Sequence, residues 1–181
     1  MQFFRIYKVP KYLYYVLSMI FVFFSLSACQ DTPKNITATV INLSSKNVIG
    51  TIHIKETKYG LIFQPSITDP HIQQGLHGFH VHMGSSCAQQ GQAAGKHFNK
   101  NKTIHAANWY EESHAGDLPN LYFDKNGHAN LPVLSNRLQL QDIQGKSLII
   151  HDHTDSYTNH THGSGGGKRI ACAIIAQVTS I

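Results

Sequence analysis

Short apolar runs with polar residues at alternate positions recur along most of this 181-residue chain, a spacing typical of β-strands. The sequence contains no amphipathic helix of useful length and no internal repeat. Turn-forming residues separate several runs, and the clearest turn, at 124–127, predicts a hairpin. The runs with strand character are 37–43, 48–55, 61–64, 78–82, 121–123, 128–133, 147–151 and 170–178. Many short strands joined by turns predict an all-β antiparallel sandwich or barrel.

Two long stretches, 85–119 and 152–168, lack strand character. Structureless segments of this length are uncommon in compact domains and usually serve a function. We therefore expect functional side chains in or beside these two loops.

The first 28 residues have the pattern of an export signal. Arg5, Lys8 and Lys11 precede an apolar run at 13–26, and Leu-Ser-Ala-Cys at 26–29 is similar to a bacterial lipobox. This predicts a lipoprotein-type signal peptide at 1–28, a lipidated Cys29 with a tether over 29–35, and one domain over 36–181. It also predicts a bacterial periplasmic protein anchored to a membrane by lipid. The alternative is an ordinary secretory signal cut nearby.

Charge excludes one class of partner. Three of the 15 Lys and Arg residues lie in the leader and none of the 10 acidic residues do, so the mature part has 12 basic residues against 10 acidic ones. Without a basic cluster or a stacking motif, the chain is not expected to bind nucleic acid. The sequence leaves the oligomeric state open.

The cysteines fit an oxidising compartment. If Cys29 carries lipid, Cys87 and Cys172 remain as an even pair. A bridge between them would be worth roughly 4–5 kcal/mol in the chain-entropy model. Two free buried thiols are the alternative.

Three histidines lie on predicted strands. His80 and His82 occupy alternate positions, so their side chains leave the same face, while Phe79 and Val81 point toward a core. His151 ends another strand. Three imidazoles favour copper, zinc, iron or nickel, although a plain polar strand face would produce the same spacing.

A second cluster falls in the first long loop. Three imidazoles and a carboxylate can close a tetrahedral shell around zinc, although unrelated polar loop residues are the alternative. The members of this cluster are His97, His105, His114 and Asp117. With the three strand histidines they make seven ligands, too many for one ion but enough for two if one imidazole is shared.

Five motifs in their order and spacing resemble copper/zinc superoxide dismutase in its bacterial exported form, from about residue 35 to 177. They are Gly-Leu-His-Gly-Phe-His-Val-His (75–82), Gly-Lys-His-Phe-Asn (95–99), His-Ala-Gly-Asp-Leu-Pro (114–119), Ile-His-Asp-His-Thr-Asp (150–155) and Gly-Gly-Gly-Lys-Arg-Ile-Ala-Cys (165–172). The resemblance implies an eight-stranded Greek-key β-barrel or sandwich with two long functional loops.

The resemblance also implies a role for each site residue. It implies copper ligands at His80, His82, His97 and His151, and zinc ligands at His97, His105, His114 and Asp117. His97 would be the shared imidazolate. Cys87 and Cys172 would form a disulfide, and Arg169, with help from Lys168, would attract the anionic substrate. Asp155 would be an outer carboxylate that links a copper-ligand histidine to a zinc-ligand histidine.

The implied reaction converts two superoxide anions to dioxygen and hydrogen peroxide by Cu(II)/Cu(I) cycling, with His97 taking up a proton when it leaves copper. Copper and zinc are the implied cofactors. The alternative function is a non-catalytic copper-binding lipoprotein that buffers or delivers metal on the same fold.

Several positions depart from the family pattern. Lys96 and Lys100 flank the His-Phe-Asn motif, residues 105–108 are poorer in glycine, and Ala173 follows Cys172. We expect these changes to affect loop conformation more than chemistry. His153, His160 and His162 fall outside the implied ligand set and are expected to be solvated loop residues, with accessory metal capture as the alternative.

Overall fold

A computed structural model describes residues 35–100, 113–156 and 165–177, and these residues form mostly antiparallel β-structure. This confirms the predicted all-β fold. The strands are β1 (Asn35–Asn42), β2 (Val48–Thr57), β3 (Gly60–Thr68), β4 (Gly75–His77), β5 (Phe79–His82), β6 (Leu121–Phe123), β7 (His128–Ala129), β8 (Val133–Ser135), β9 (Ser147–His151) and β10 (Arg169–Ile174).

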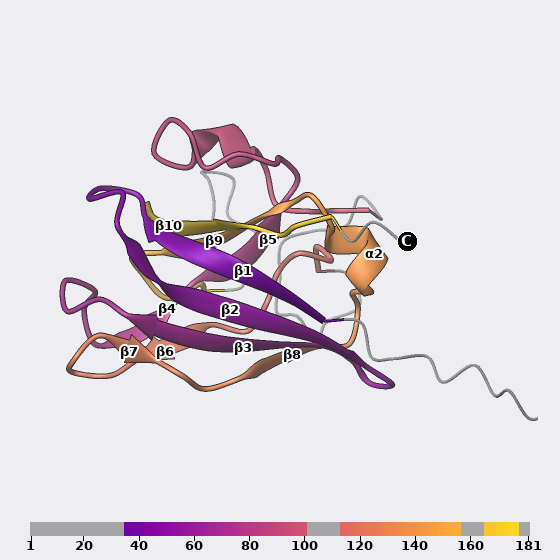
Figure 1. Ribbon diagram of the computed structural model, residues 1–181, viewed down its shortest axis with the longest axis horizontal. Helices are drawn as coiled ribbons and strands as arrows, with labels where there is room; N and C mark the ends of the chain where they lie inside the picture. The colour runs from indigo at the N-terminus through magenta and orange to yellow at the C-terminus, as the bar shows by residue number, and fades with distance from the viewer. Residues whose placement is uncertain (1–34, 101–112, 157–164, 178–181) are drawn as a thin grey trace, which may run out of the picture. The chain divides into compact units, whose positions relative to one another are not determined.

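Eight of these strands form one curled sheet, in the order β5-β9-β10-β1-β2-β3-β7, with β8 also pairing with β3. β4 and β6 form a separate two-stranded sheet. Figure 1 shows β1, β2 and β3 side by side, with β10 continuing the sheet beyond β1. The last strand, β10, thus lies beside the first, as in a Greek key, where the chain returns over a long connection to the first strand. Because β9 lies between β10 and β5, the C-terminal motifs come next to β5.

Alternation of side chains along the strands builds the core. In β1 the buried residues are Ile36, Ala38 and Val40, each 5% exposed or less, with exposed polar residues between them. Because successive side chains point to opposite faces of a sheet, one face of β1 packs inward. β3 contributes Phe63, whose ring meets that of Phe79 edge-on at a centroid distance of 5.8 Å. The same core therefore supports the strand that carries His80 and His82.

The predicted strand at 128–133 is two strands, β7 and β8, both paired with β3. β7 pairs with Ile67 and Thr68, and β8 pairs with residues 61–63, so Pro65 falls in the gap between them. Proline has no N–H to donate to a ladder, and Pro132 lies in the matching gap. A side chain partly fills the gap, since Gln64 Nε2 donates to the Asn130 carbonyl over 2.7 Å.

The predicted strand at 78–82 is β5 without its first residue, because Gly78 joins neither ladder, and β4 is a short strand that the sequence did not predict. The Gly78 N–H donates to the His153 carbonyl over 2.8 Å, and its carbonyl accepts from the His151 N–H over 2.9 Å. β4 therefore ends before Gly78 and pairs with β6, while β5 begins after it and pairs with β9. The eight strands of the main sheet are thus not the eight that the pattern predicted.

The helices of the described residues are short, as the sequence predicted. They are the 3-10 turn η1 (Gln92–Ala94) and the single turn α2 (Leu140–Ile143). Across the described ranges, no helix is long and apolar enough to cross a membrane.

A disulfide ties the first long loop to the sheet. Cys87 bonds to Cys172 of β10, with 5.8 Å between their Cα atoms, which confirms the disulfide that the family resemblance implied. Leu43, Ala94 and Ile149 pack around Cys172 in a small apolar cluster separate from the main core. The loop that leads to His97 is therefore fixed by the disulfide at Cys87 and by the packing of Ala94.

We expect the double substitution Cys87→Ser and Cys172→Ser to lower the free energy of unfolding by about 2–5 kcal/mol, the usual range for removal of a native disulfide, because the bridge closes a long loop in the unfolded chain. Urea unfolding of metal-free protein measures this change. Wild-type protein treated with a reductant should show the same loss, and an unchanged midpoint in both samples would contradict the prediction.

Candidate metal centre

β5 places two imidazoles in the interior of the protein. His80 and His82 are both fully buried, and the intervening Val81 and the preceding Phe79 belong to the hydrophobic core. Burial of a polar side chain is costly unless its polar atoms are satisfied. The four-residue strand therefore needs polar partners for both rings, and neighbouring segments supply them.

Three main-chain hydrogen bonds hold β5 against the two segments that carry the loop ligands. The Phe98 N–H donates to the Val81 carbonyl (2.7 Å), the Gly116 N–H donates to the Phe98 carbonyl (2.7 Å), and the Val81 N–H donates to the Gly116 carbonyl (2.9 Å). These bonds close a ring, which we call the backbone triangle. Each of its residues is next to a candidate ligand: Val81 lies between His80 and His82, Phe98 follows His97, and Gly116 precedes Asp117.

Gly116 is required in the backbone triangle because the segments approach so closely. A Cβ atom at this position would lie 2.4 Å from the Val81 carbonyl oxygen and 2.9 Å from the Phe98 nitrogen. Any side chain would separate the segments and, with them, the ligands they carry.

Strand register adds the last imidazole. His151 ends β9, is fully buried, and lies directly opposite Arg169 of β10. β9 also pairs with β5 through residues 147–150, and the His151 N–H donates to the carbonyl of Gly78, just before β5, over 2.9 Å. This sets His151 beside the β5 histidines.

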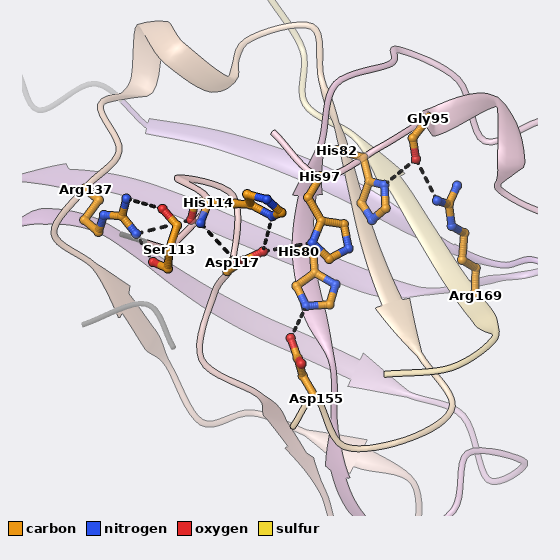
Figure 2. Close-up of polar contacts among 10 residues, drawn as sticks. All are labelled: His80, His82, Gly95, His97, Ser113, His114, Asp117, Arg137, Asp155 and Arg169. Atoms are coloured by element: carbon orange, nitrogen blue, oxygen red, sulfur yellow. Dashed lines mark hydrogen bonds and ion pairs between the residues drawn. The ribbon is translucent and has the colours of Figure 1, made fainter. Parts of the chain in front are cut away.

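The structure thus brings four of the predicted ligands into one group. One ring nitrogen from each of these histidines lies within 4.8 Å of the corresponding nitrogens of the others; the four are His80, His82, His97 and His151. Figure 2 shows His80, His82 and His97 turned toward one another. These four histidines are the residues that the family resemblance implied as copper ligands.

Hydrogen bonds fix which nitrogen each ring presents. His82 Nδ1 donates to the Gly95 carbonyl over 2.9 Å, and His151 Nδ1 donates to the Gly167 carbonyl over 3.0 Å. The Nε2 atoms of these two rings are buried and have no hydrogen-bond partner among the described residues. Histidine ligands typically donate their second ring nitrogen in this way, which leaves the other lone pair for a metal. Buried acceptor nitrogens converging on one point fit a metal ion.

The same interior keeps the imidazoles neutral. Burial, followed by the charge of His97, lowers the pKa of His80 to about 3 and that of His82 to about 2. Burial lowers the pKa of His151 to about 4. Neutral imidazole is the form that binds metals, so these rings present a lone pair at neutral pH.

A second group of metal-ligating side chains meets the first. It contains His97, His114 and Asp117, again with one ligand atom each within 4.8 Å of the others. Asp117 Oδ1 lies 2.8 Å from His97 Nδ1 and 3.4 Å from His114 Nδ1. These three are predicted zinc ligands, and the fourth, His105, lies outside the described residues.

His97 is the residue common to both groups. Its Nδ1 side faces Asp117, so its Nε2 side is the one that the copper group can use. The 9% exposure of His97 shows that the ring lies almost wholly inside the protein. The predicted shared imidazole is therefore placed between the two ligand sets.

An outer arginine supports the second group. The Arg137 guanidinium donates to the Ser113 hydroxyl and carbonyl and, over 3.3 Å, to the His114 carbonyl. Figure 2 shows Arg137 reaching the segment that holds His114 from the side away from His97. Arg137 thus restrains the main chain of a candidate zinc ligand.

The outer carboxylate is also where the sequence predicted it. Asp155 is 2% exposed, and its Oδ2 accepts from His80 Nε2 over 2.6 Å. With Nε2 engaged in this bond, Nδ1 is the nitrogen that His80 can offer a metal. The predicted link from Asp155 to a zinc-ligand histidine stays a prediction.

Arg169 is held over the copper group by the first long loop. Its guanidinium donates to the Gly91 carbonyl over 2.5 Å and to the Gly95 carbonyl over 2.6 Å. Gly95 is the same residue whose carbonyl accepts from His82, as Figure 2 shows. Partial burial lowers the pKa of Arg169, but guanidinium remains cationic in proteins.

Among the described residues, the loop histidine His153 belongs to neither group. His153 is exposed and its Nδ1 lies 2.7 Å from Asp152 Oδ1, while His160 and His162 lie outside the described residues.

Lys96 and Lys100, which depart from the family pattern, each make a contact that holds the segment around His97. The Lys96 carbonyl accepts from the Met83 N–H over 2.9 Å. Lys100 Nζ donates to both carboxylate oxygens of Asp142 at 3.2 Å.

Sequence reasoning missed several supporting groups. Arg137 and Asn120 had no signal because their partners lie far away in the sequence. The carbonyls of Gly95 and Gly167 had none because every residue has a carbonyl. Gly116 had a weak one, because a glycine between two candidate ligands suggests a close approach of backbones.

We expect Gly116→Ala to weaken copper and zinc binding together, each by about tenfold or more, because outer supports of metal sites contribute on this scale. Competition with chelators of known affinity measures both constants. Gly75→Ala is the control: its Cβ would meet nothing within 4 Å, although φ of +140° makes it mildly strained. Unchanged affinities in Gly116→Ala, or loss of only one metal, would contradict the role of the backbone triangle.

Comparison with known proteins agrees with this site. Residues 48–175 match the family model described as copper/zinc superoxide dismutase (SODC). Proteins called superoxide dismutase [Cu-Zn] are similar to the chain: that of Photobacterium leiognathi is 35% identical over 156 residues, covering 81% of this chain and 89% of that protein. That of Pasteurella multocida is 41% identical over 138 residues, covering 70% and 73%. The structure of Cu/Zn superoxide dismutase from Brucella abortus superposes with a TM-score of 0.72 at 31% identity, covering 78% of this chain and 99% of that one. The chain belongs to the copper/zinc superoxide dismutase family.

Proposed function

We propose that this protein converts superoxide to dioxygen and hydrogen peroxide at a copper–zinc pair bridged by His97. The observation that carries the proposal is the membership of His97 in both ligand groups. Two superoxide anions and two protons give one molecule of each product, so the reaction needs one-electron exchange and a proton source close together.

The ligand sets follow from the geometry and the family pattern. His80, His82, His97 and His151 would hold copper, and His97, His114 and Asp117 would hold zinc together with His105. Imidazole nitrogens suit both oxidation states of copper, and a set of three nitrogens and one carboxylate suits zinc. Copper would supply the one-electron chemistry, and zinc would supply structure and charge.

The chain's own residues would bind the substrate and handle the proton. His97 Nδ1 is held toward Asp117, so Nε2 is the atom at which His97 can take up and return a proton. Arg169 presents a fixed positive charge beside His82. Since superoxide is a small anion, attraction by this charge is the main way the protein can raise the rate of encounter.

We also propose that the mature protein is a periplasmic lipoprotein. The lipobox at 26–29 supports lipidation of Cys29, with 1–28 as the signal, 29–35 as the tether and 36–181 as the enzyme domain. The Cys87–Cys172 disulfide supports an oxidising compartment. The relatives from Photobacterium leiognathi and Pasteurella multocida are bacterial proteins, in keeping with a bacterial export route.

Labelling cells with a radioactive fatty acid tests the anchor. We expect the wild-type protein to carry label and to sediment with membranes, while Cys29→Ser carries none and is recovered in the soluble periplasmic fraction if it is still processed. Unlabelled wild-type protein would exclude lipidation, and recovery of wild type from the cytoplasm would exclude export.

Magnetic coupling between two metal ions tests whether His97 bridges them. With Co(II) in the zinc site and Cu(II) in the copper site, a bridging imidazolate couples the two ions, so the Cu(II) signal in electron paramagnetic resonance should be lost or strongly weakened. His97→Gln should restore an uncoupled signal and abolish most superoxide consumption. A full Cu(II) signal from doubly loaded wild type would contradict the bridge. A bridged centre that does not consume superoxide would favour the copper-buffering alternative.

We expect Arg169→Ala to lower the second-order rate of superoxide consumption by about tenfold or more and to weaken its dependence on salt, because a local positive charge steers anions. Stopped-flow measurement over a range of ionic strength checks both effects, with copper content measured alongside. Lys168→Ala removes an equal charge one residue away and should have a smaller effect. Equal losses in the two variants would mean that overall charge, rather than the position of Arg169, sets the rate.

A further inference from the structure

Asn120 makes a two-point contact with a distant part of the chain. Its Oδ1 accepts from the Asp155 N–H over 3.0 Å, and its Nδ2 donates to the Asp155 carbonyl over 3.2 Å. The partners are 35 residues apart in sequence. The contact holds both main-chain polar groups of Asp155.

Asp155 transmits this restraint to a metal ligand. Its carboxylate is buried and accepts from His80 Nε2 over 2.6 Å, as Figure 2 shows. A short side chain on a fixed backbone has few positions open to it, so the placement of the Asp155 main chain sets where its carboxylate meets the ring. The carboxylate in turn sets the orientation of the His80 imidazole.

Asn120 also belongs to the segment that carries a zinc ligand. It lies three residues after Asp117, and Asp117 forms an isolated β-bridge with His80. A closed path of contacts therefore runs from Asp117 through Asn120, Asp155 and His80 back to Asp117. This path joins the two ligand groups without passing through His97.

We propose that Asn120 is a positioning residue that orients the copper ligand His80 through Asp155 and couples this ring to the zinc-ligand segment. The inference rests on the proposed copper site. It assigns to Asn120 no contact with substrate or metal.

The chemistry of the contact requires an amide. Asp155 presents one donor and one acceptor, and only a side chain with one acceptor and one donor in a fixed fork matches both. Asn120→Asp keeps the acceptor but places a second oxygen against the Asp155 carbonyl. Asn120→Ala removes both bonds. Asn120→Asp therefore tests the donor alone, and Asn120→Ala tests both bonds.

Copper binding in zinc-loaded, full-length mature protein tests the inference. We expect Asn120→Ala to weaken Cu(II) affinity by about tenfold, the lower end of the range for outer supports of metal ligands. We also expect its electron paramagnetic resonance spectrum to shift, since one imidazole turns relative to the others. Asn120→Asp should also weaken Cu(II) affinity and shift the spectrum, because its second oxygen faces the Asp155 carbonyl. Asn130→Ala, at an exposed position beyond β7, is the matched control and should match wild type.

A double-mutant cycle separates positioning from general stability. In an Asp155→Ala background, Asn120→Ala should change copper affinity by less than about twofold, because the link through which it acts is already broken. An undiminished tenfold effect in that background would overturn the proposal, as would a wild-type affinity and spectrum in Asn120→Ala. If Asn120→Ala does not fold, Asn120→Asp serves in the same cycle. Failure of the wild-type protein itself to bind copper would instead refute the proposed function.

Discussion

The backbone triangle of Val81, Phe98 and Gly116 is the contact on which the rest of the centre depends. Metal ligands must be placed to within a fraction of an ångström, and side chains on separate loops cannot achieve this alone. Here the ligands on three segments are neighbours of main-chain atoms bonded directly to one another. Main-chain hydrogen bonds are short and directional. They therefore fix the positions of the ligands as closely as strand pairing would, although two of the segments are loops.

Each further layer restrains what the backbone triangle leaves open. The disulfide and the cluster around Cys172 fix the loop before His97, and Arg137 fixes the main chain at His114. Carbonyl and carboxylate acceptors then choose the ring nitrogen that each histidine presents. The interior lowers the pKa values of the β5 histidines, mainly through burial, so that the rings stay neutral. Together these contacts fix the position and the orientation of each candidate ligand.

The sequence predicted the ligands better than their supports. Alternation along a strand was enough to put His80 and His82 on one side, and the strand ending at His151 completed the set. The sequence could not show that Gly78 would bond to His151 and His153 and so lie outside both ladders, nor that Pro65 and Pro132 would face a gap in the ladder. It gave no sign of Asn120 or of the Gly95 carbonyl, because such partners are defined by tertiary contacts and any residue has a carbonyl. Side-chain chemistry leaves a trace in sequence, whereas main-chain acceptors do not.

The Gly95 carbonyl oxygen accepts from both His82 and Arg169. One atom therefore fixes a metal ligand on one side and a guanidinium on the other. A change in this loop that moves Gly95 would therefore alter both the orientation of the His82 ring and the position of the Arg169 charge that attracts an anion. An engineer who wished to admit a larger anion would do better to leave residues 91–95 alone and to introduce a new cation from a different strand.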